Sequence, residues 1–205
     1  MKALVKYAEG PGNVEIRDVP IPSIEDREIL VKVHAAGFCG TDTEIYRWDF
    51  KTRIPVIMGH EGAGEVVEVG RSVTGIHVGD RVALETSKII CGTCDYCRIG
   101  RYNLCYNRRG MGYGTDGTFA EFVKTEGNKA HRIPENISYE EAAILEPLSV
   151  TTRAVIQIAD IQGGDTVLVS GPGPIGLFLL QVVKAVGASK IIVVGRKSQE
   201  RLALA

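Results

Sequence analysis

The chain has 205 residues, of which 44% are hydrophobic and 24% charged, a composition typical of globular proteins and unlike that of disordered or fibrous chains. Its 24 Lys and Arg residues nearly balance 25 Asp and Glu residues, so the formal net charge is -1 and there is no basic excess to attract nucleic acid. No stretch reaches the ~18 consecutive apolar residues of a membrane span, and the N-terminus lacks the apolar segment of a secretion signal. We therefore expect a cytoplasmic protein that binds neither nucleic acid nor membranes.

The first part of the chain has the pattern of a mostly β domain. Residues 2–129 contain short, β-branched apolar runs, and turn residues such as Pro11-Gly12 and Gly79-Asp80 separate them. One predicted strand covers residues 29–36 and leads to Cys39. We expect one domain over residues 1–147 and a second over 148–205.

A helical stretch follows the β domain. Ser138 and Glu141 form a capping-box pattern at its start. Proline disfavours the α conformation of the residue before it. We therefore expect Pro147 to split the helix, with the break at Glu146.

The pattern after Gly164 predicts one βαβ unit, with parallel strands over 166–169 and 190–194 and a helix over 174–186. A G-x-G-x-x-G loop joins the first strand to the helix. This context is typical of a dinucleotide site, in which the glycines let the backbone approach a pyrophosphate at the helix N-terminus; the alternative is a merely tight turn. The residues expected to bind the coenzyme are Gly171, Gly173, Pro174, Ile175 and Gly176.

The end of the second strand indicates which coenzyme binds. An Asp or Glu normally binds the adenosine ribose at this point, about 20 residues after the loop. The chain has Arg196 and Lys197 there instead, and two cations suit a 2′-phosphate. The sequence therefore favours NADP over NAD, unless these residues are ordinary solvated side chains that open the next helix.

Five cysteines in 205 residues are too sparse for a disulfide scaffold, and their odd number argues against full pairing. Four of the five occur within fifteen residues, in the pattern C-x2-C-x2-C-x7-C. Four thiolates with no further ligand are typical of a closed, structural zinc site, whereas four free thiols would leave a polar lobe with little to hold it folded. The expected ligands are Cys91, Cys94, Cys97 and Cys105.

A second set of metal-binding residue types is more widely spaced. Cys39, His60 and Glu61 could supply a thiolate, an imidazole and a carboxylate to a catalytic zinc with one position open to substrate. Isolated Cys and His residues are, however, more often ordinary core or surface residues. The spacing alone leaves both interpretations open.

The same region resembles the medium-chain dehydrogenase/reductase family. Its zinc signature is matched by Gly59, His60, Glu61, Gly64, Gly70 and Val73. Cys39-Gly40-Thr41-Asp42 resembles the family's first metal ligand followed by a hydroxyl relay residue, and the four-cysteine spacing and the glycine loop are also similar. The segment from Glu146 resembles the third ligand of the polyol (sorbitol) dehydrogenases, and residues 44–49 are similar to the threonine dehydrogenase branch.

The resemblance implies an N-terminal, GroES-like, mostly β catalytic domain followed by the first βαβ part of a Rossmann domain. It implies two zinc ions per chain, one structural and one held by Cys39, His60 and Glu146, with Glu61 as an alternating ligand. Hydride would pass between NAD(P) and a secondary alcohol such as a polyol, a sugar alcohol or an amino alcohol like threonine. Thr41 would relay the proton towards Glu44, where many relatives carry histidine. The parent protein would be a homo-oligomer, a dimer or a tetramer.

The coenzyme domain is expected to be incomplete. Such domains typically have about six strands, and the sequence predicts two before it ends at Ala205, so we expect a truncated form of a longer parent. Two other functions stay open. One is a non-catalytic, zinc-stabilised module that binds a partner, which the missing half of the coenzyme domain makes less implausible. The other is a zinc-free quinone or enoyl reductase of the same superfamily, against which the four-cysteine lobe and the set of Cys39, His60 and Glu146 argue.

Overall fold

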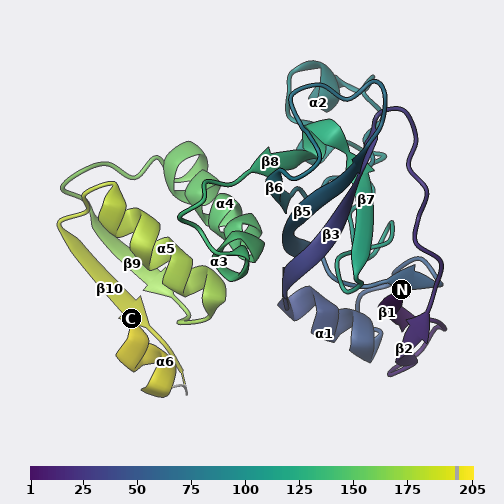
Figure 1. Cartoon of the computed structure of the whole chain (residues 1–205). Helices are drawn as coiled ribbons and strands as arrows, with labels where there is room; N and C mark the ends of the chain where they lie inside the picture. Colours follow the sequence, from purple (N-terminus) through teal and green to yellow (C-terminus); the bar gives the residue numbers. More distant parts are fainter. Residues whose placement is uncertain (197–198) are drawn as a thin grey trace. The chain divides into compact units, whose positions relative to one another are not determined.

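A computed structural model describes residues 1–196 and 199–205 of the chain. These residues form two compact units, Met1–Ile144 and Leu145–Ala205 (Figure 1). Lys197, one of the two cations predicted to bind a 2′-phosphate, lies outside the described residues. In the described part of the chain, every helix is too short or too polar to cross a membrane.

The N-terminal unit is built from two antiparallel sheets, as the mostly β prediction requires. The larger sheet has five strands in the order β7-β3-β5-β6-β8, and the smaller has three in the order β2-β1-β4 (Figure 1). The strands of the larger sheet are β3 (Glu28–Gly37), β5 (Glu61–Val69), β6 (Arg81–Leu84), β7 (Phe122–Glu126) and β8 (Ala130–Arg132). Those of the smaller sheet are β1 (Lys2–Lys6), β2 (Val14–Asp18) and β4 (Val56–Ile57).

Short helical segments connect these strands. They are α1 (Gly40–Arg47), α2 (Asp95–Arg98), α3 (Tyr139–Ala143) and the 3-10 turns Tyr102–Leu104 and Gly127–Lys129. The sequence did not predict α1, because Thr41, Thr43 and Ile45 are β-branched and favour strands locally. The predicted capping box does begin α3, where the Ser138 hydroxyl accepts a hydrogen bond from the backbone N–H of Glu141 (3.1 Å).

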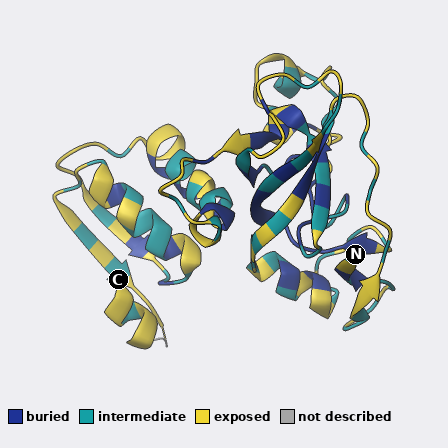
Figure 2. Ribbon diagram, viewed as in Figure 1, coloured by how far each residue is buried: buried dark blue, intermediate teal, exposed yellow. Residues whose placement is uncertain are grey.

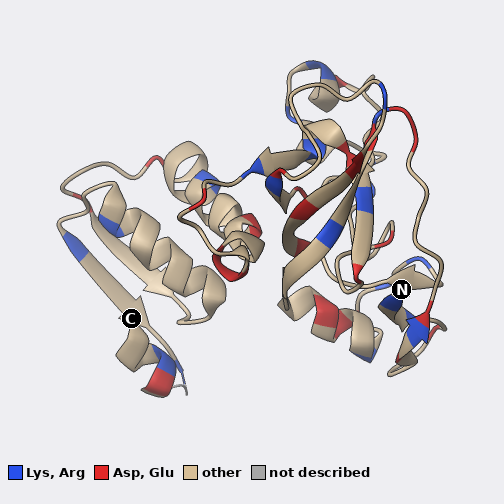
Figure 3. Ribbon diagram, viewed as in Figure 1, with Lys and Arg blue, Asp and Glu red and all other residues tan. Residues whose placement is uncertain are grey.

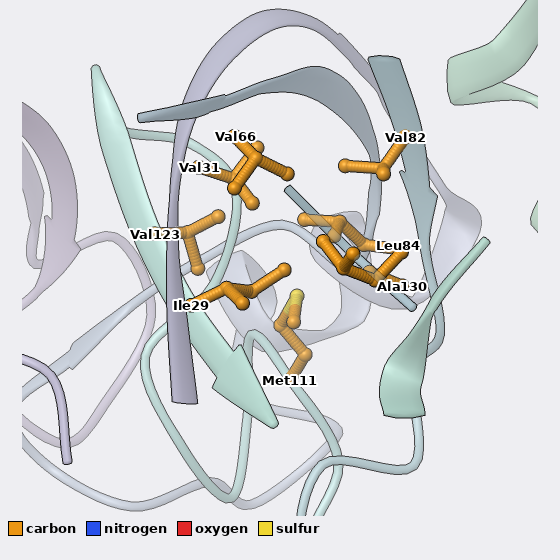
Figure 4. Close-up of a cluster of buried hydrophobic side chains, with 9 residues drawn as sticks. Ile29, Val31, Val66, Val82, Leu84, Met111, Val123 and Ala130 are labelled. Atoms are coloured by element: carbon orange, nitrogen blue, oxygen red, sulfur yellow. The ribbon is translucent and has the colours of Figure 1, made fainter. Parts of the chain in front are cut away.

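The core of the N-terminal unit lies against the larger sheet (Figure 4). Alternate residues of a strand point to the same face, so Ile29 and Val31 of β3 both enter this core. Neighbouring strands add to the same cluster, and the loop residue Met111 packs into it. The labelled members in Figure 4 are Ile29, Val31, Val66, Val82, Leu84, Met111, Val123 and Ala130.

The C-terminal unit contains the predicted βαβ arrangement. Its elements are α4 (Leu145–Arg153), a π-helical turn (Ala154–Ile158), β9 (Thr166–Ser170), α5 (Pro174–Ala185), β10 (Lys190–Val194) and α6 (Gln199–Leu204). Strands β9 and β10 pair in parallel. The one charged residue of α5 is Lys184, and the helix is otherwise almost entirely tan in Figure 3. Leu168 of β9 and Ile192 of β10 are exposed, and Figure 2 shows exposed positions along both strands.

The expected helix break at Glu146 is wrong. Helix α3 ends at Ala143, with Ile144 as its C-cap, and Glu146 is the second residue of α4, with Pro147 in the first turn. Proline is tolerated there because the first N–H groups of a helix have no partner within the helix. Glu146 is therefore helical in this structure, despite the steric restriction that Pro147 places on its backbone.

The pairing of β3 with β5 depends on close contact between their backbones. Gly64 of β5 lies opposite Val33, and a Cβ atom at Gly64 would lie 2.0 Å from the carbonyl oxygen of Lys32. No side chain fits at that distance. The glycine that belongs to the zinc signature is therefore required here by the sheet.

We expect Gly64→Ala to lower the free energy of unfolding by about 1 to 3 kcal/mol, because β3 and β5 must move apart to admit the methyl group. Urea denaturation of the purified chain measures this change. Gly40→Ala is the control, since no neighbouring heavy atom lies within 4 Å of a Cβ there and alanine favours helix α1. Equal stability of the Gly64 variant and the unmodified chain would contradict the steric explanation.

Candidate functional site

Three potential metal ligands meet where β3 and β5 are joined. The ligand atoms of Cys39, His60 and Glu61 all lie within 4.8 Å of one another. His60 and Glu61 are buried, and Cys39 is half-buried. The structure thus brings together three of the four residues predicted for a catalytic zinc, although Cys39 precedes His60 by 21 residues in the chain. A thiolate, an imidazole and a carboxylate are all donors that zinc accepts.

The local backbone explains how the three side chains fit. Gly37, the last residue of β3, pairs with Glu61, the first residue of β5. A Cβ atom at Gly37 would lie 2.1 Å from Oε2 of Glu61, so the missing side chain makes room for this carboxylate. Cys39 then forms the N-cap of α1. The end of one strand and the start of a helix therefore hold the cluster.

Asp42 is a site residue to which sequence reasoning gave no role. It is fully buried, its Oδ2 accepts a hydrogen bond from the Cys39 N–H (2.9 Å), and its Oδ1 lies 3.8 Å from Nδ1 of His60. Burial raises the pKa of Asp42 above its ordinary value, although the Cys39 N–H and the nearby imidazole oppose the shift. The available signal was its spacing of three residues from Cys39, which is typical of a capping position.

Asp42 can orient His60 for metal binding. Oδ1 of Asp42 and Nδ1 of His60 are both buried without a hydrogen-bond partner among the described residues. A proton on Nδ1 facing the carboxylate leaves Nε2 free as a ligand, which is the usual arrangement of metal-binding histidines. The geometry therefore favours a cation on the Nε2 side of the ring.

The two predicted relay residues both lie on α1. The hydroxyl Oγ1 of Thr41 is 3.7 Å from Sγ of Cys39, so Thr41 borders the cluster. Glu44 follows one helical turn later and is exposed. Glu146, the remaining predicted ligand, belongs to α4 of the C-terminal unit.

The four-cysteine lobe forms a second cluster of ligands. The sulfur atoms of Cys91, Cys94, Cys97 and Cys105 all lie within 4.8 Å of one another. Two of the distances, Cys91 to Cys105 at 3.5 Å and Cys91 to Cys97 at 4.0 Å, are close to the ~3.8 Å between the sulfurs of a tetrahedral zinc with Zn–S bonds of about 2.3 Å. No disulfide joins these cysteines.

The thiols of the lobe differ in how readily they ionise. Backbone N–H groups of Thr93 and Cys94 donate to Cys91 and lower the pKa of its thiol to about 5. Burial and the neighbouring sulfurs raise the pKa of Cys97 to about 12, because a second negative charge so close to the first is unfavourable. A cation bound among the sulfurs would offset the repulsion between neighbouring thiolates.

The predicted coenzyme loop forms a tight turn between β9 and α5. Gly171 has φ +100°, a conformation that favours glycine, and a Cβ at Gly176 would lie 1.8 Å from the Gly171 carbonyl oxygen. Gly173 is the N-cap of α5, with Pro174 as the first helical residue, and nothing lies within 4 Å of its Cβ position. Arg196 follows β10 and is exposed. The backbone around Gly173 is thus open to a ligand at a helix N-terminus.

We expect Asp42→Asn to weaken zinc binding at the Cys39, His60 and Glu61 cluster by about 10- to 100-fold, because the carboxylate no longer fixes the imidazole. Competition with a zinc chelator measures the affinity. Asp49→Asn, a change at an exposed carboxylate just beyond α1, is the control and should leave the affinity unchanged. Equal affinities of the two variants would remove Asp42 from the site.

We also expect Cys97→Ser to release one zinc ion and unfold residues 91–105, because the binding energy of a structural zinc is folding energy. Metal analysis and limited proteolysis measure the two effects. Asn103→Ala, at an exposed position of the same lobe, should retain zinc and resist protease. A Cys97 variant with full metal content and protease resistance would show that the four sulfurs do not form a structural site.

Comparison with known proteins gives the family. Residues 25–135 match the model of the alcohol dehydrogenase GroES-like domain. The chain is 41% identical over 206 residues to D-arabitol-phosphate dehydrogenase of Enterococcus avium, covering 100% of the chain and 58% of that protein. It is 43% identical over 202 residues to sorbitol dehydrogenase of Halalkalibacterium halodurans, covering 98% of the chain and 59% of that protein.

Solved structures agree in fold. A zinc-binding dehydrogenase of Sinorhizobium meliloti, bound to NADP, superimposes with a TM-score of 0.92 at 37% identity, covering 99% of this chain and 58% of that one. Galactitol-1-phosphate dehydrogenase of Escherichia coli gives 0.90 at 31% identity, covering 100% and 58%. The chain thus spans less than two thirds of its relatives' length. It belongs to the medium-chain dehydrogenase/reductase family, with the alcohol dehydrogenase GroES-like domain over residues 25–135.

Proposed function

We propose that this protein is a zinc-dependent dehydrogenase that transfers hydride between a secondary alcohol and NAD(P). The observation that carries the proposal is the cluster of Cys39, His60 and Glu61 beside the Thr41 hydroxyl. Relatives named as dehydrogenases of a polyol phosphate, a polyol and L-threonine support a hydroxyl-bearing substrate. The substrate class is therefore a secondary alcohol with further polar groups.

The donor set fits zinc. One soft thiolate, one imidazole and carboxylate ligands match the ligands of catalytic zinc sites, and the pairing of Asp42 with Nδ1 of His60 gives that imidazole a fixed orientation. We propose Cys39, His60 and Glu146 as the ligands, with Glu61 as an alternating one. A bound zinc would act as a Lewis acid that makes the alcohol hydroxyl more acidic.

The residues on α1 would move the proton that the alcohol releases. Thr41 borders Cys39 and carries a hydroxyl, which can accept one proton while it donates its own. Glu44 lies one helical turn away and is exposed, so it can pass the proton to solvent. We propose this short path in place of the histidine-containing relay of many relatives.

The coenzyme would bind at the glycine loop. We propose that Gly171, Gly173, Pro174, Ile175 and Gly176 hold the pyrophosphate, with Arg196 and Lys197 on the 2′-phosphate of NADP. The NADP in the Sinorhizobium meliloti structure supports this preference. Another relative, from Escherichia coli, was solved with NADH, so both coenzymes occur among the relatives. The proposed preference for NADP therefore rests on Arg196 and Lys197 of this chain.

We propose that the chain is divided into two domains. Residues 1–147 hold the metal ions, and residues 148–205 hold part of the coenzyme site. We also propose that the full-length parent protein forms a homo-oligomer, either a dimer or a tetramer.

We expect the chain to hold two zinc ions and Glu146→Ala to hold one, with the four-cysteine zinc retained. Cys39→Ala and His60→Ala should give the same loss. Inductively coupled plasma mass spectrometry counts the zinc, and Glu140→Ala, an exposed carboxylate on α3, is the control. A second zinc retained in the Glu146 variant would make Glu61 the third ligand.

The metal content of the unmodified chain also tests the other two functions. One zinc per chain would favour the non-catalytic module, and none would favour the zinc-free reductase. Zinc-dependent reduction of NADP by a secondary alcohol tests the complete activity.

A further inference from the structure

Arg108 follows Cys105, the last cysteine of the four-cysteine lobe, by three residues. Its side chain is half-buried. Its Nε–H donates a hydrogen bond to the buried hydroxyl of Ser87 (2.7 Å), and its Nη1 donates to the hydroxyl of Tyr113 (2.8 Å). These two bonds fix the plane of the guanidinium.

One hydrogen-bond partner of Arg108, Tyr113, packs against His60, and the other, Ser87, directly follows a residue that contacts the His60 backbone. The Tyr113 ring meets the His60 ring edge-on, with 6.2 Å between ring centroids, and the guanidinium carbon is 6.0 Å from the Tyr113 centroid. Thr86, the neighbour of Ser87, directs its hydroxyl to the His60 carbonyl oxygen (3.4 Å). The Tyr113 ring therefore lies against both the guanidinium of Arg108 and the imidazole of His60.

The charge of Arg108 is not balanced by the described part of the chain. None of the described carboxylates lies within ion-pair distance of it, and both of its hydrogen-bond partners are neutral hydroxyls. Arg81, by contrast, directs its guanidinium to the carbonyl oxygens of residues 134, 135 and 137. Two of the five N–H donors of Arg108 form these hydrogen bonds, so the other three can donate to a ligand.

We propose that Arg108 anchors an anionic group of the alcohol substrate, a phosphate or a carboxylate, while the reacting hydroxyl lies at the Cys39, His60 and Glu61 cluster. A planar guanidinium with free N–H donors forms strong, often bidentate hydrogen bonds with such groups. The proposal rests on the proposed function and narrows it. The protein prefers an alcohol that carries an oxyanion to a neutral polyol.

The test compares three probes on the zinc-loaded chain by isothermal titration calorimetry: D-arabitol, an arabitol phosphate and L-threonine. We expect at least one anionic probe to bind about 10- to 100-fold more tightly than D-arabitol. Arg108→Gln should remove that preference by weakening the binding of the anionic probe. Arg108→Lys should restore part of it, because the charge returns without the planar fork.

Arg109→Gln is the matched control, since Arg109 is the adjacent arginine and is exposed. It should keep the preference. Zinc content and thermal unfolding of each variant show whether the fold is retained, and the preference of the unmodified chain tests the proposal even where a variant does not fold.

The outcomes separate the sources of the anionic group and the two proposals. Tight binding of the arabitol phosphate alone identifies a phosphate site, and tight binding of L-threonine alone identifies a carboxylate site. Equal binding of all three probes, or an equal loss of preference in the Arg108 and Arg109 variants, overturns the role of Arg108 but leaves the proposed function standing. A zinc-loaded chain that binds no alcohol contradicts both.

Discussion

The antiparallel pairing of Gly37 with Glu61 is the contact on which the candidate catalytic cluster depends. It brings the end of β3 to the start of β5, so that Cys39 and His60, just outside the two strands, become neighbours. Two glycines make this register sterically accessible, because Gly37 leaves space for the Glu61 carboxylate and Gly64 lets the backbones touch. The pairing of β3 with β5 and the candidate metal site thus depend on the same two glycines.

Burial then determines what the cluster can do. His60, Glu61 and Asp42 are all removed from water, and a buried carboxylate near an imidazole is costly unless each has a partner. The Cys39 N–H satisfies one oxygen of Asp42, and the other oxygen faces His60. A cation on the remaining ring nitrogen would complete this arrangement, which is the physical reason to regard the cluster as a metal site.

The four-cysteine lobe is stabilised in a different way. Of its residues from 91 to 105, Cys105 alone is buried, so packing contributes little to its folding. An internal contact ties it to the larger sheet: the ammonium of Lys129, only 3% exposed, lies 3.7 Å from the Tyr102 ring centroid and pairs with Glu85 (3.3 Å). This anchor contributes to an ordered lobe with almost no core, and a zinc ion shared by the four sulfurs would supply further stability.

The sequence by itself determined the features that depend on neighbouring residues: the cysteine spacing, the capping box at Ser138, and the βαβ pattern around its glycine loop. It also indicated Cys39, His60 and Glu61, although spacing alone left them as isolated residues. Only the tertiary structure placed Asp42 beside His60 and Arg108 beside Tyr113, and it moved the helix break from Glu146 to Ile144. The physical reason is that strand register and packing join residues far apart in the chain, and local preferences carry no information about those contacts.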